Sequence, residues 1–181
     1  MKTLEDQMSF YAAYHQDARN KATHFVGVPL IAFSLMIPLG WLRADVGEFT
    51  LSAALAVTAI LLLYYLVLDI PLGLASCVVF ALMLWGADTL SQMPLVPGLA
   101  WFLILFVGGW ALQLWGHVYE GRKPALVDNL FQVFVAPIFL AAEVFFALGY
   151  KPALHEAVQR RAMQMRAQAG SAVPPGGLKS A

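Results

Sequence analysis

The chain has 181 residues, with eleven Lys and Arg, eleven Asp and Glu, and no formal net charge at pH 7. Hydrophobic residues make up 60% and charged residues 12%, whereas a soluble domain is about half apolar and about a quarter charged. So little charge cannot cover a water-facing surface, which predicts an integral membrane protein. The balanced charge gives no reason to expect a nucleic-acid partner, and the single Cys77 excludes an internal disulfide scaffold.

A short amphipathic helix is predicted first, over residues 3–16. Leu4, Met8, Tyr11 and His15 recur three or four residues apart, so they form one stripe along this helix. His15 should therefore point in the same direction as the apolar residues of the stripe.

Four apolar runs follow that are long enough, or nearly so, to cross a bilayer, which takes about 20 mostly apolar residues. They are residues 25–42, 49–68, 72–87 and 98–116. A fifth run, residues 126–149, is long enough but contains Pro137 and the carboxylates Asp128 and Glu143. A charged residue at mid-bilayer costs about 3 kcal/mol on insertion scales. We therefore expect the fifth segment to be re-entrant or buried in the helix bundle rather than to face lipid.

The C-terminal part of the chain is more polar. Residues 151–169 predict a basic amphipathic helix at the membrane interface, and residues 170–181, rich in Gly, Pro, Ser and Ala, predict a disordered tail. The expected fold class is thus an all-α integral membrane protein. It has four transmembrane helices and the fifth segment within residues 1–150, flanked by amphipathic N- and C-terminal helices.

The basic residues predict the orientation in the membrane. With a cytoplasmic N-terminus and four crossings, ten of the eleven basic residues lie on the cytoplasmic side and only Arg43 lies outside. A fifth crossing would divide them almost evenly, against the positive-inside rule. We expect both termini to be cytoplasmic, in the plasma membrane of a bacterium or the endoplasmic reticulum of a eukaryote.

This topology places several polar residues at the same depth, on the cytoplasmic side of the membrane. Asn20 and His24 share a helix face where the first span begins, and His117 and Glu120 share one where the fourth span ends. Both positions lie at the cytoplasmic side, as does His15. Non-haem Fe(II) centres use His and carboxylate ligands and leave coordination positions open for substrate and oxygen. Each histidine taken singly also fits structural hydrogen bonding at the interface.

Further polar residues accompany the histidines. Arg122 and Lys123 fit either positive-inside anchoring or capture of a carboxylate. His155, in the basic helix, is a weaker candidate for the site. Side chains that can orient ligating histidines or bind substrate are Tyr11, Asn20, Gln113, Asp128, Asn129, Gln132 and Glu143. Asp128 can equally cap a helix, and Glu143 must be neutral, paired or directed into a polar cavity.

The order and spacing of these residues resemble one protein family. The motifs are Tyr11-xxx-His15, Asn20-xxx-His24-xx-Gly27-x-Pro29, Gly116-His117-xx-Glu120-Gly-Arg-x-Pro124-Ala and Asp128-Asn129-Leu130, followed by Ala136-Pro137 and Glu143. Such motifs, weak singly but fairly specific together, resemble those of the membrane-bound 2-hydroxy-fatty-acid dioxygenases, long known as a domain of unknown function. The best-known members act in the endoplasmic reticulum in phytosphingosine breakdown. The resemblance covers about residues 1–150.

The resemblance implies an activity and a ligand set. It implies an Fe(II)-dependent oxidoreductase that uses dioxygen to shorten a long-chain 2-hydroxy fatty acid by one carbon, releasing carbon dioxide without 2-oxoglutarate. Residues 1–150 then form the catalytic domain. His15, His24 and His117 are the implied metal ligands. Our hypothesis adds Glu120 as a fourth ligand or nearby base, with Arg122 or Lys123 on the substrate carboxylate.

Two other classes of function stay open. A membrane lipid hydrolase using zinc-activated water would turn over without oxygen. A non-catalytic helical protein that binds lipid would keep its histidines as structural groups and bind no stoichiometric metal.

Overall fold

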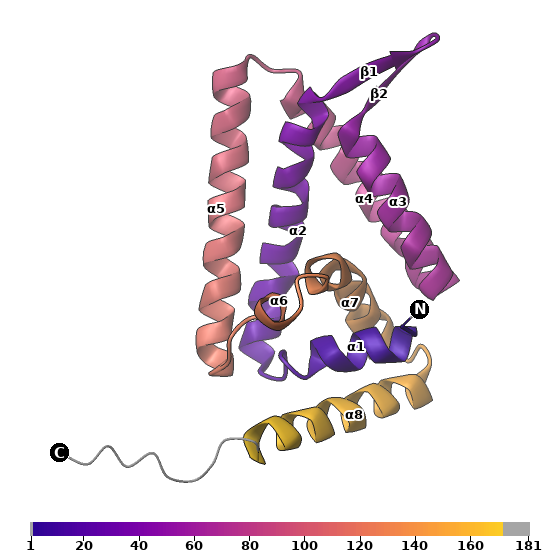
Figure 1. Ribbon diagram of the computed structural model, residues 1–181, viewed down its shortest axis with the longest axis vertical. Helices are drawn as coiled ribbons and strands as arrows, with labels where there is room; N and C mark the ends of the chain where they lie inside the picture. Colours follow the sequence, from indigo (N-terminus) through magenta and orange to yellow (C-terminus); the bar gives the residue numbers. More distant parts are fainter. Residues whose placement is uncertain (1, 172–181) are drawn as a thin grey trace, which may run out of the picture.

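The computed structural model describes residues 2–171 and is mostly helical (Figure 1). The elements of this part of the chain are α1 (Leu4–Ala12), α2 (Ala18–Trp41), β1 (Arg43–Val46), β2 (Phe49–Ser52), α3 (Ala53–Leu68), α4 (Ile70–Ser91), α5 (Leu95–Glu120), α6 (Ala125–Asp128), α7 (Gln132–Ala147) and α8 (Pro152–Ser171). The basic helix therefore ends two residues later than the sequence predicts. Of the expected disordered tail, residues 172–181 lie outside the described residues.

Three helices, α2, α4 and α5, are long and apolar enough to cross a membrane. Helix α3 is equally apolar but has only 16 residues, which is about 24 Å at 1.5 Å per residue, against about 30 Å for a bilayer core. Figure 1 shows α2 and α4 running toward the end of the molecule that carries the strands, and α3 and α5 running back. The start of α2 and the end of α5 therefore lie at the same end of the molecule, as the sequence predicts.

The expectation of a purely helical fold is wrong at the connection between α2 and α3. Strands β1 and β2 pair as an antiparallel hairpin, closed by a two-residue turn in which Gly47 has a φ of +65°. Such turns favour glycine because the first central residue needs a positive φ. The predicted second span, residues 49–68, therefore begins as a helix only at Ala53, where Ser52 Oγ accepts a hydrogen bond from Leu55 N at 3.2 Å.

Helices α2 and α5 pack closely because small residues face each other. A Cβ atom on Gly109 would lie 3.1 Å from the carbonyl oxygen of Gly27. A Cβ atom on Gly116 would lie 2.1 Å from Thr23 Oγ1 and 2.5 Å from Asn20 Oδ1. The two backbones can approach this closely only without side chains, and the approach brings the histidines of the two helices together.

Helix α7 fills the space between α2 and the α3–α4 pair at the end where both α1 and α8 lie (Figure 1). It packs against α1, α2 and α4 and buries Val135, Ile138 and Phe139. Its deep carboxylate, Glu143, accepts a hydrogen bond from Lys21 Nζ at 2.7 Å. Glu143 is thus paired with a cation, one of the three situations that its position in the sequence allowed.

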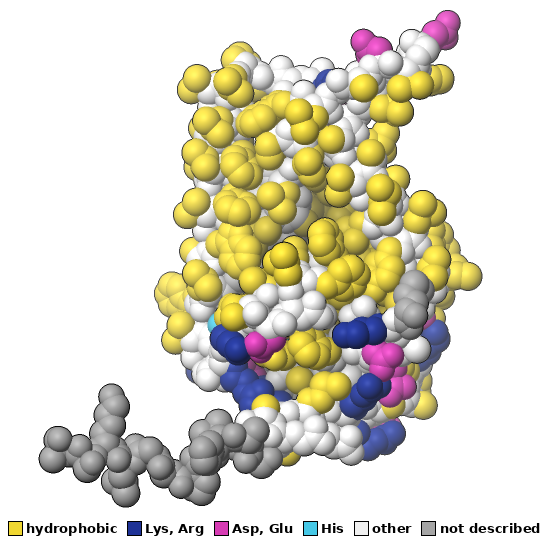
Figure 2. Space-filling view, in the orientation of Figure 1, with side chains coloured by type: hydrophobic (Ala, Val, Ile, Leu, Met, Phe, Trp, Pro, Cys, Tyr) yellow, Lys and Arg dark blue, Asp and Glu magenta, His cyan; other side chains and the backbone are white. Residues whose placement is uncertain are grey.

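Charged side chains gather at the α1–α8 end of the molecule, and hydrophobic ones cover its middle (Figure 2). Ion pairs hold helix α8 there: Arg161 pairs with Asp6 at 2.6 Å, Arg166 pairs with Glu120, and Lys151, just before α8, pairs with Asp69 at 2.6 Å. The carboxylate of Asp69 holds the pKa of Lys151 above its usual value. Arg43 lies at the opposite end, paired with Asp88 at 2.6 Å.

The close approach of α2 and α5 makes one substitution informative. In Gly116→Ala, the new methyl group must displace Thr23 and Asn20, and overpacking of this kind costs about 1–3 kcal/mol. We expect this variant to have a lower midpoint of thermal unfolding in detergent, as measured by circular dichroism. The matched control is Gly108→Ala on the same helix, whose Cβ would meet nothing within 4 Å. Equal midpoints for the two variants would refute the importance of this contact.

Candidate metal centre

His15 reaches the interior from a loop rather than from a helix. Helix α1 ends at Ala12, so the predicted helix over residues 3–16 is four residues too long. The ring of His15 nevertheless stacks on Tyr11, with centroids 4.1 Å apart and planes 6° from parallel. Its Nδ1 donates to the Tyr11 carbonyl oxygen at 2.8 Å. The side chain therefore faces the same way as the stripe of α1, although the backbone has left the helix.

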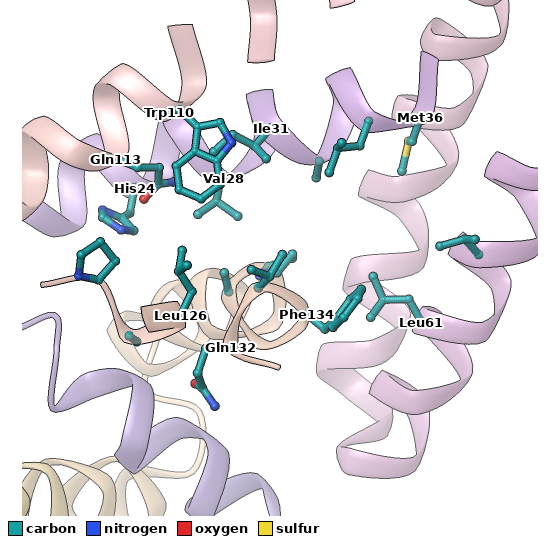
Figure 3. Close-up of a pocket in the computed structure, with 18 of the residues that line it drawn as sticks. His24, Val28, Ile31, Met36, Leu61, Trp110, Gln113, Leu126, Gln132 and Phe134 are labelled. Carbon is teal, nitrogen blue, oxygen red and sulfur yellow. The ribbon is translucent and has the colours of Figure 1, made fainter. Parts of the chain in front are cut away.

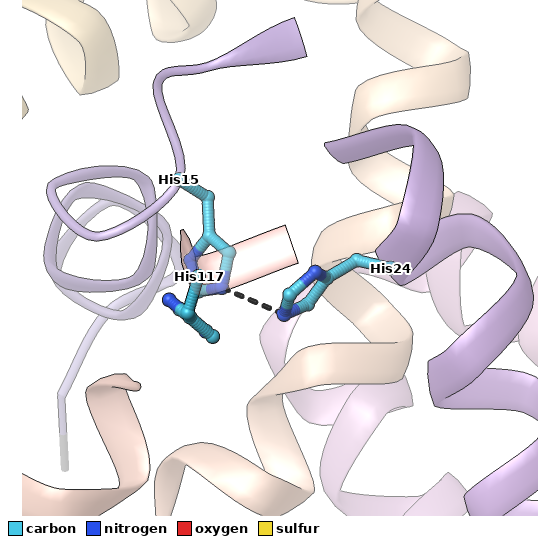
Figure 4. A group of neighbouring side chains, drawn as sticks. All are labelled: His15, His24 and His117. Atoms are coloured by element: carbon cyan, nitrogen blue, oxygen red, sulfur yellow. Dashed lines mark hydrogen bonds between the residues drawn. The ribbon is translucent and has the colours of Figure 1, made fainter. Parts of the chain in front are cut away.

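His24 and His117 come from the paired helices α2 and α5. His24 Nδ1 donates to the carbonyl oxygen of Asn20, one turn earlier, at 2.9 Å. His117 lies in the last turn of α5, which ends where Gly121 adopts a φ of +65°. All three histidines are buried, with exposures of 2%, 3% and 7% in chain order. Their ring centroids are 4.5 to 5.0 Å apart (Figure 4).

The hydrogen bonds fix the tautomers of two of these rings. A backbone carbonyl can only accept, so Nδ1 carries the proton in both His15 and His24. Their Nε2 atoms then present lone pairs to each other across 3.1 Å, the contact dashed in Figure 4. Burial, and then the neighbouring His24, hold the pKa of His15 well below its usual value. The facing lone pairs therefore repel each other unless a cation lies between them.

This donor set fits a metal ion. One ligand atom from each of the three histidines lies within 4.8 Å of the others. Two imidazole nitrogens that each lie about 2.1 Å from one metal ion, at a right angle, would be about 3 Å apart. The Nε2 atoms of His15 and His24 have this separation. In metal sites, a ligating histidine is usually oriented by a hydrogen bond from its other ring nitrogen. The bonds from Nδ1 of His15 and His24 to backbone carbonyl oxygens are of this kind. Three ligands leave coordination positions open.

The carboxylate of Glu120, a predicted fourth ligand, is not among these donors. Its Oε2 atom accepts hydrogen bonds from the backbone N–H groups of Gln16 and Asp17 and from Asn20 Nδ2, and its Oε1 atom pairs with Arg166. Glu120 therefore holds the loop that carries His15.

The cations after α5 lie outside the centre. Lys123 Nζ pairs with Asp128 at 2.5 Å, and Tyr14 donates to the same carboxylate at 2.6 Å. These partners hold the pKa of Asp128 below its usual value, while burial and Asp128 raise that of Tyr14 to about 12. Asn129 accepts a hydrogen bond from the Phe131 backbone. Arg122, Lys123, Asp128 and Asn129 do not line the cavity next to the histidines.

An apolar cavity of about 470 Å³ extends from the histidines toward the hairpin end of the molecule (Figure 3). Small-molecule sites have volumes of about 300–1,000 Å³. Its walls come from α2, α3, α5 and α7, and it reaches Leu42 and Val57. Two buried amides, Gln113 and Gln132, are among the lining residues, and Nε2 of each has no hydrogen-bond partner in the described chain. Sequence reasoning missed this cavity because every wall is drawn from an apolar run without a distinguishing signal.

The described chain is thus a helical bundle with three helices able to cross a membrane and a three-histidine candidate metal centre at the head of an apolar cavity. Residues 1–148 match the model of the Mpo1-like family, described as 2-hydroxy-palmitic acid dioxygenase Mpo1-like, and the chain belongs to that family. The 2-hydroxy-palmitic acid dioxygenase MPO1 of Saccharomyces cerevisiae is 36% identical over 154 residues, which cover 83% of this chain and 84% of the yeast protein. No solved structure matches the chain.

Metal binding tests the centre directly. We expect the wild type to bind about one equivalent of Fe(II) or Co(II). His15→Ala, His24→Ala and His117→Ala should each weaken binding more than about tenfold, because losing only a hydrogen-bond partner of a ligating histidine already costs that much. The control is His155→Ala, since His155 stacks on Phe146 with ring centroids 4.7 Å apart and lies outside the cluster. Isothermal titration under argon measures the affinities. Unchanged affinity in all three cluster variants would show that the histidines are structural.

Proposed function

We propose that this protein is an Fe(II)-dependent dioxygenase that shortens long-chain 2-hydroxy fatty acids by one carbon. The observation that carries the proposal is the pair of facing Nε2 lone pairs of His15 and His24, beside His117, at the head of an apolar cavity. Membership of the Mpo1-like family, with a yeast relative named for the oxidation of 2-hydroxy-palmitic acid, supplies the substrate class.

The proposed reaction balances without any further co-substrate. A 2-hydroxy acid and one dioxygen give a carboxylic acid one carbon shorter, one carbon dioxide and one water. The C1–C2 bond breaks, C2 is oxidised from an alcohol to a carboxyl group, and the four electrons released reduce the dioxygen. Neither an external reductant nor 2-oxoglutarate is therefore required.

His15, His24 and His117 would hold the metal. Bound Fe(II) would supply open coordination positions at which substrate and dioxygen can meet. The two carbonyl-bonded imidazoles keep their lone pairs directed to one point, and the surrounding apolar walls exclude water from it. Three imidazoles also suit zinc or copper, so the choice of iron rests on the oxygen chemistry of the family.

We assign the polar head of the substrate to Gln113. Gln113 is 6% exposed, lines the cavity together with the histidines, and has an N–H donor group without a hydrogen-bond partner among the described residues. Rotation of the amide by half a turn exchanges its donor and acceptor ends, so the group can bind a carboxylate or a hydroxyl. Arg122 and Lys123, expected to hold the carboxylate, serve instead as anchors at the membrane surface.

The acyl tail would lie along α2 in the apolar cavity. The lining residues run from His24 to Leu42, and 18 residues of helix rise about 27 Å. Pro38, Leu39 and Thr58 line the far part of this space. A long chain therefore gains burial at every methylene, at about 0.8 kcal/mol each.

We further propose that α2, α3, α4 and α5 all cross the membrane and that α7 remains within the cytoplasmic half. Both termini are then cytoplasmic, in a bacterial plasma membrane or a eukaryotic endoplasmic reticulum. The short α3 fits such a crossing because strand β2 directly precedes it and lengthens the apolar segment with Phe49 and Leu51. The positions of Arg43 at one end and of α8 at the other support this orientation.

A single turnover experiment separates this function from its alternatives. Protein loaded with Fe(II) under argon is given a 2-hydroxy fatty acid labelled with carbon-13 at C1, and then oxygen. We expect one dioxygen consumed and one labelled carbon dioxide released for each acid shortened. In a parallel reaction under argon, hydrolysis of an ester- or amide-linked lipid by the zinc-loaded protein would favour a zinc hydrolase, and no turnover of either lipid would favour a non-catalytic lipid-binding role.

The cavity predicts a dependence on chain length. Each methylene removed from the substrate should raise KM by up to about fourfold, the equivalent of about 0.8 kcal/mol. Ala32→Phe fills the middle of the cavity, so we expect it to abolish the preference for long chains while short chains still react. Ala81→Phe, at an exposed position on α4, is the control and should behave as the wild type. An unaltered chain-length profile in Ala32→Phe would place the acyl tail elsewhere.

A further inference from the structure

The loop between α1 and α2 carries one of the three histidines of the centre. His15 follows the end of α1 at Ala12 and precedes the start of α2 at Ala18. Ligands on helices are held by the helix, whereas a ligand on a loop is only as well positioned as its supporting contacts. The contacts that fix this loop therefore decide whether the three imidazoles converge.

Glu120 fixes the loop on the C-terminal side of His15. Its Oε2 atom accepts hydrogen bonds from Gln16 N at 2.9 Å, Asp17 N at 2.8 Å and Asn20 Nδ2 at 3.1 Å. The Glu120 side chain is 1% exposed. A buried carboxylate needs this many donors together with a compensating charge, because an unpaired buried ion is strongly unfavourable.

Arg166 of α8 supplies that charge and also fixes the N-terminal side of His15. Its Nη1 atom pairs with Glu120 Oε1 and donates to the carbonyl oxygen of Ala13 at 3.2 Å. A single guanidinium thus bridges the residue two positions before His15 and the carboxylate that binds the two residues after it. The side chain of Arg166 is about one quarter exposed, so it closes the loop from the membrane-surface side.

We infer that Arg166, acting through Glu120 and Ala13, is a positioning residue for His15, so that α8 completes the metal centre. The inference rests on the proposed metal-binding function. It extends that function to a helix beyond residue 148, where the match to the family ends. Neither Arg166 nor Glu120 touches the metal in this assignment; both hold the backbone on either side of a ligand.

The same helix offers a matched control. Arg161 pairs with Asp6 at 2.6 Å and Glu5 at 3.7 Å, so it docks α8 on α1, and its ion-pair partners in the described chain lie outside the His15 loop. Removing Arg161 loosens the docking of the helix, whereas removing Arg166 also releases Ala13 and leaves the Glu120 carboxylate uncompensated. The two variants therefore separate docking of α8 from positioning of His15.

The experiment titrates Co(II) into the full-length protein in detergent and follows both affinity and the visible ligand-field spectrum, which reports the geometry of the bound ion. We expect Arg166→Ala to weaken Co(II) binding about 10- to 100-fold, the range for residues that orient ligands, and to alter the spectrum. Arg166→Lys should recover part of the affinity, because it restores the charge but only part of the bridging. Arg161→Ala should bind as the wild type does.

Several results would decide against the inference. Wild-type affinity and spectrum in Arg166→Ala would overturn it and leave the proposed function intact. An equal loss in Arg161→Ala would show that docking of α8 alone matters. No Co(II) binding by the wild type would overturn the proposed metal function, and the inference with it. If Arg166→Ala does not fold, as judged by circular dichroism, the comparison uses Arg166→Lys and Glu120→Gln, and unchanged binding in both would equally refute it.

Discussion

The close approach of α2 and α5 is the constraint on which the rest of this structure depends. Glycines at Gly27, Gly109 and Gly116 let the two backbones meet where larger side chains would clash. The contact sets the separation of His24 and His117, which lie on facing helices. The part of α2 beside this contact lines the cavity, and Ile31 belongs to both. Lipid gives little hydrophobic drive for helices to associate, so packing of small residues has to hold them together.

Buried charge is arranged around this pair of helices rather than within the cavity. Glu143 is paired with Lys21, and Glu120 with Arg166 and three N–H donors. Both carboxylates would be costly if unpaired, and their partners come from segments distant in sequence. The ion pairs therefore fasten α7 and α8 to the bundle, while the walls that would contact an acyl chain remain apolar. The three imidazoles lie at the boundary between these two regions.

Much of the site could be predicted from local spacing. The i, i+4 relation of Asn20 and His24 fixes a shared face on any helix, and both are buried beside His117. Charge asymmetry correctly placed the start of α2 and the end of α5 on the same side of the bundle, where His24 and His117 meet. The role of Glu120 could not be predicted, because a carboxylate three residues from a histidine looks the same whether it faces a metal or a backbone N–H. Arg166 lies 46 residues away in the chain, and no local pattern links the two.

The amino-acid sequence by itself determined that the chain is helical and apolar, where its long helices run, and which histidines share a level. These properties depend on hydropathy, helical period and charge, which are local or additive along the chain. Only the tertiary structure decided that residues 43–52 form a hairpin, that α1 stops before His15, and that Glu120 binds the loop. The contact of Glu120 joins segments far apart in the chain, and a buried carboxylate takes whichever N–H groups the packing brings within reach. The hairpin and the end of α1 are local features that hydropathy and helical period do not distinguish.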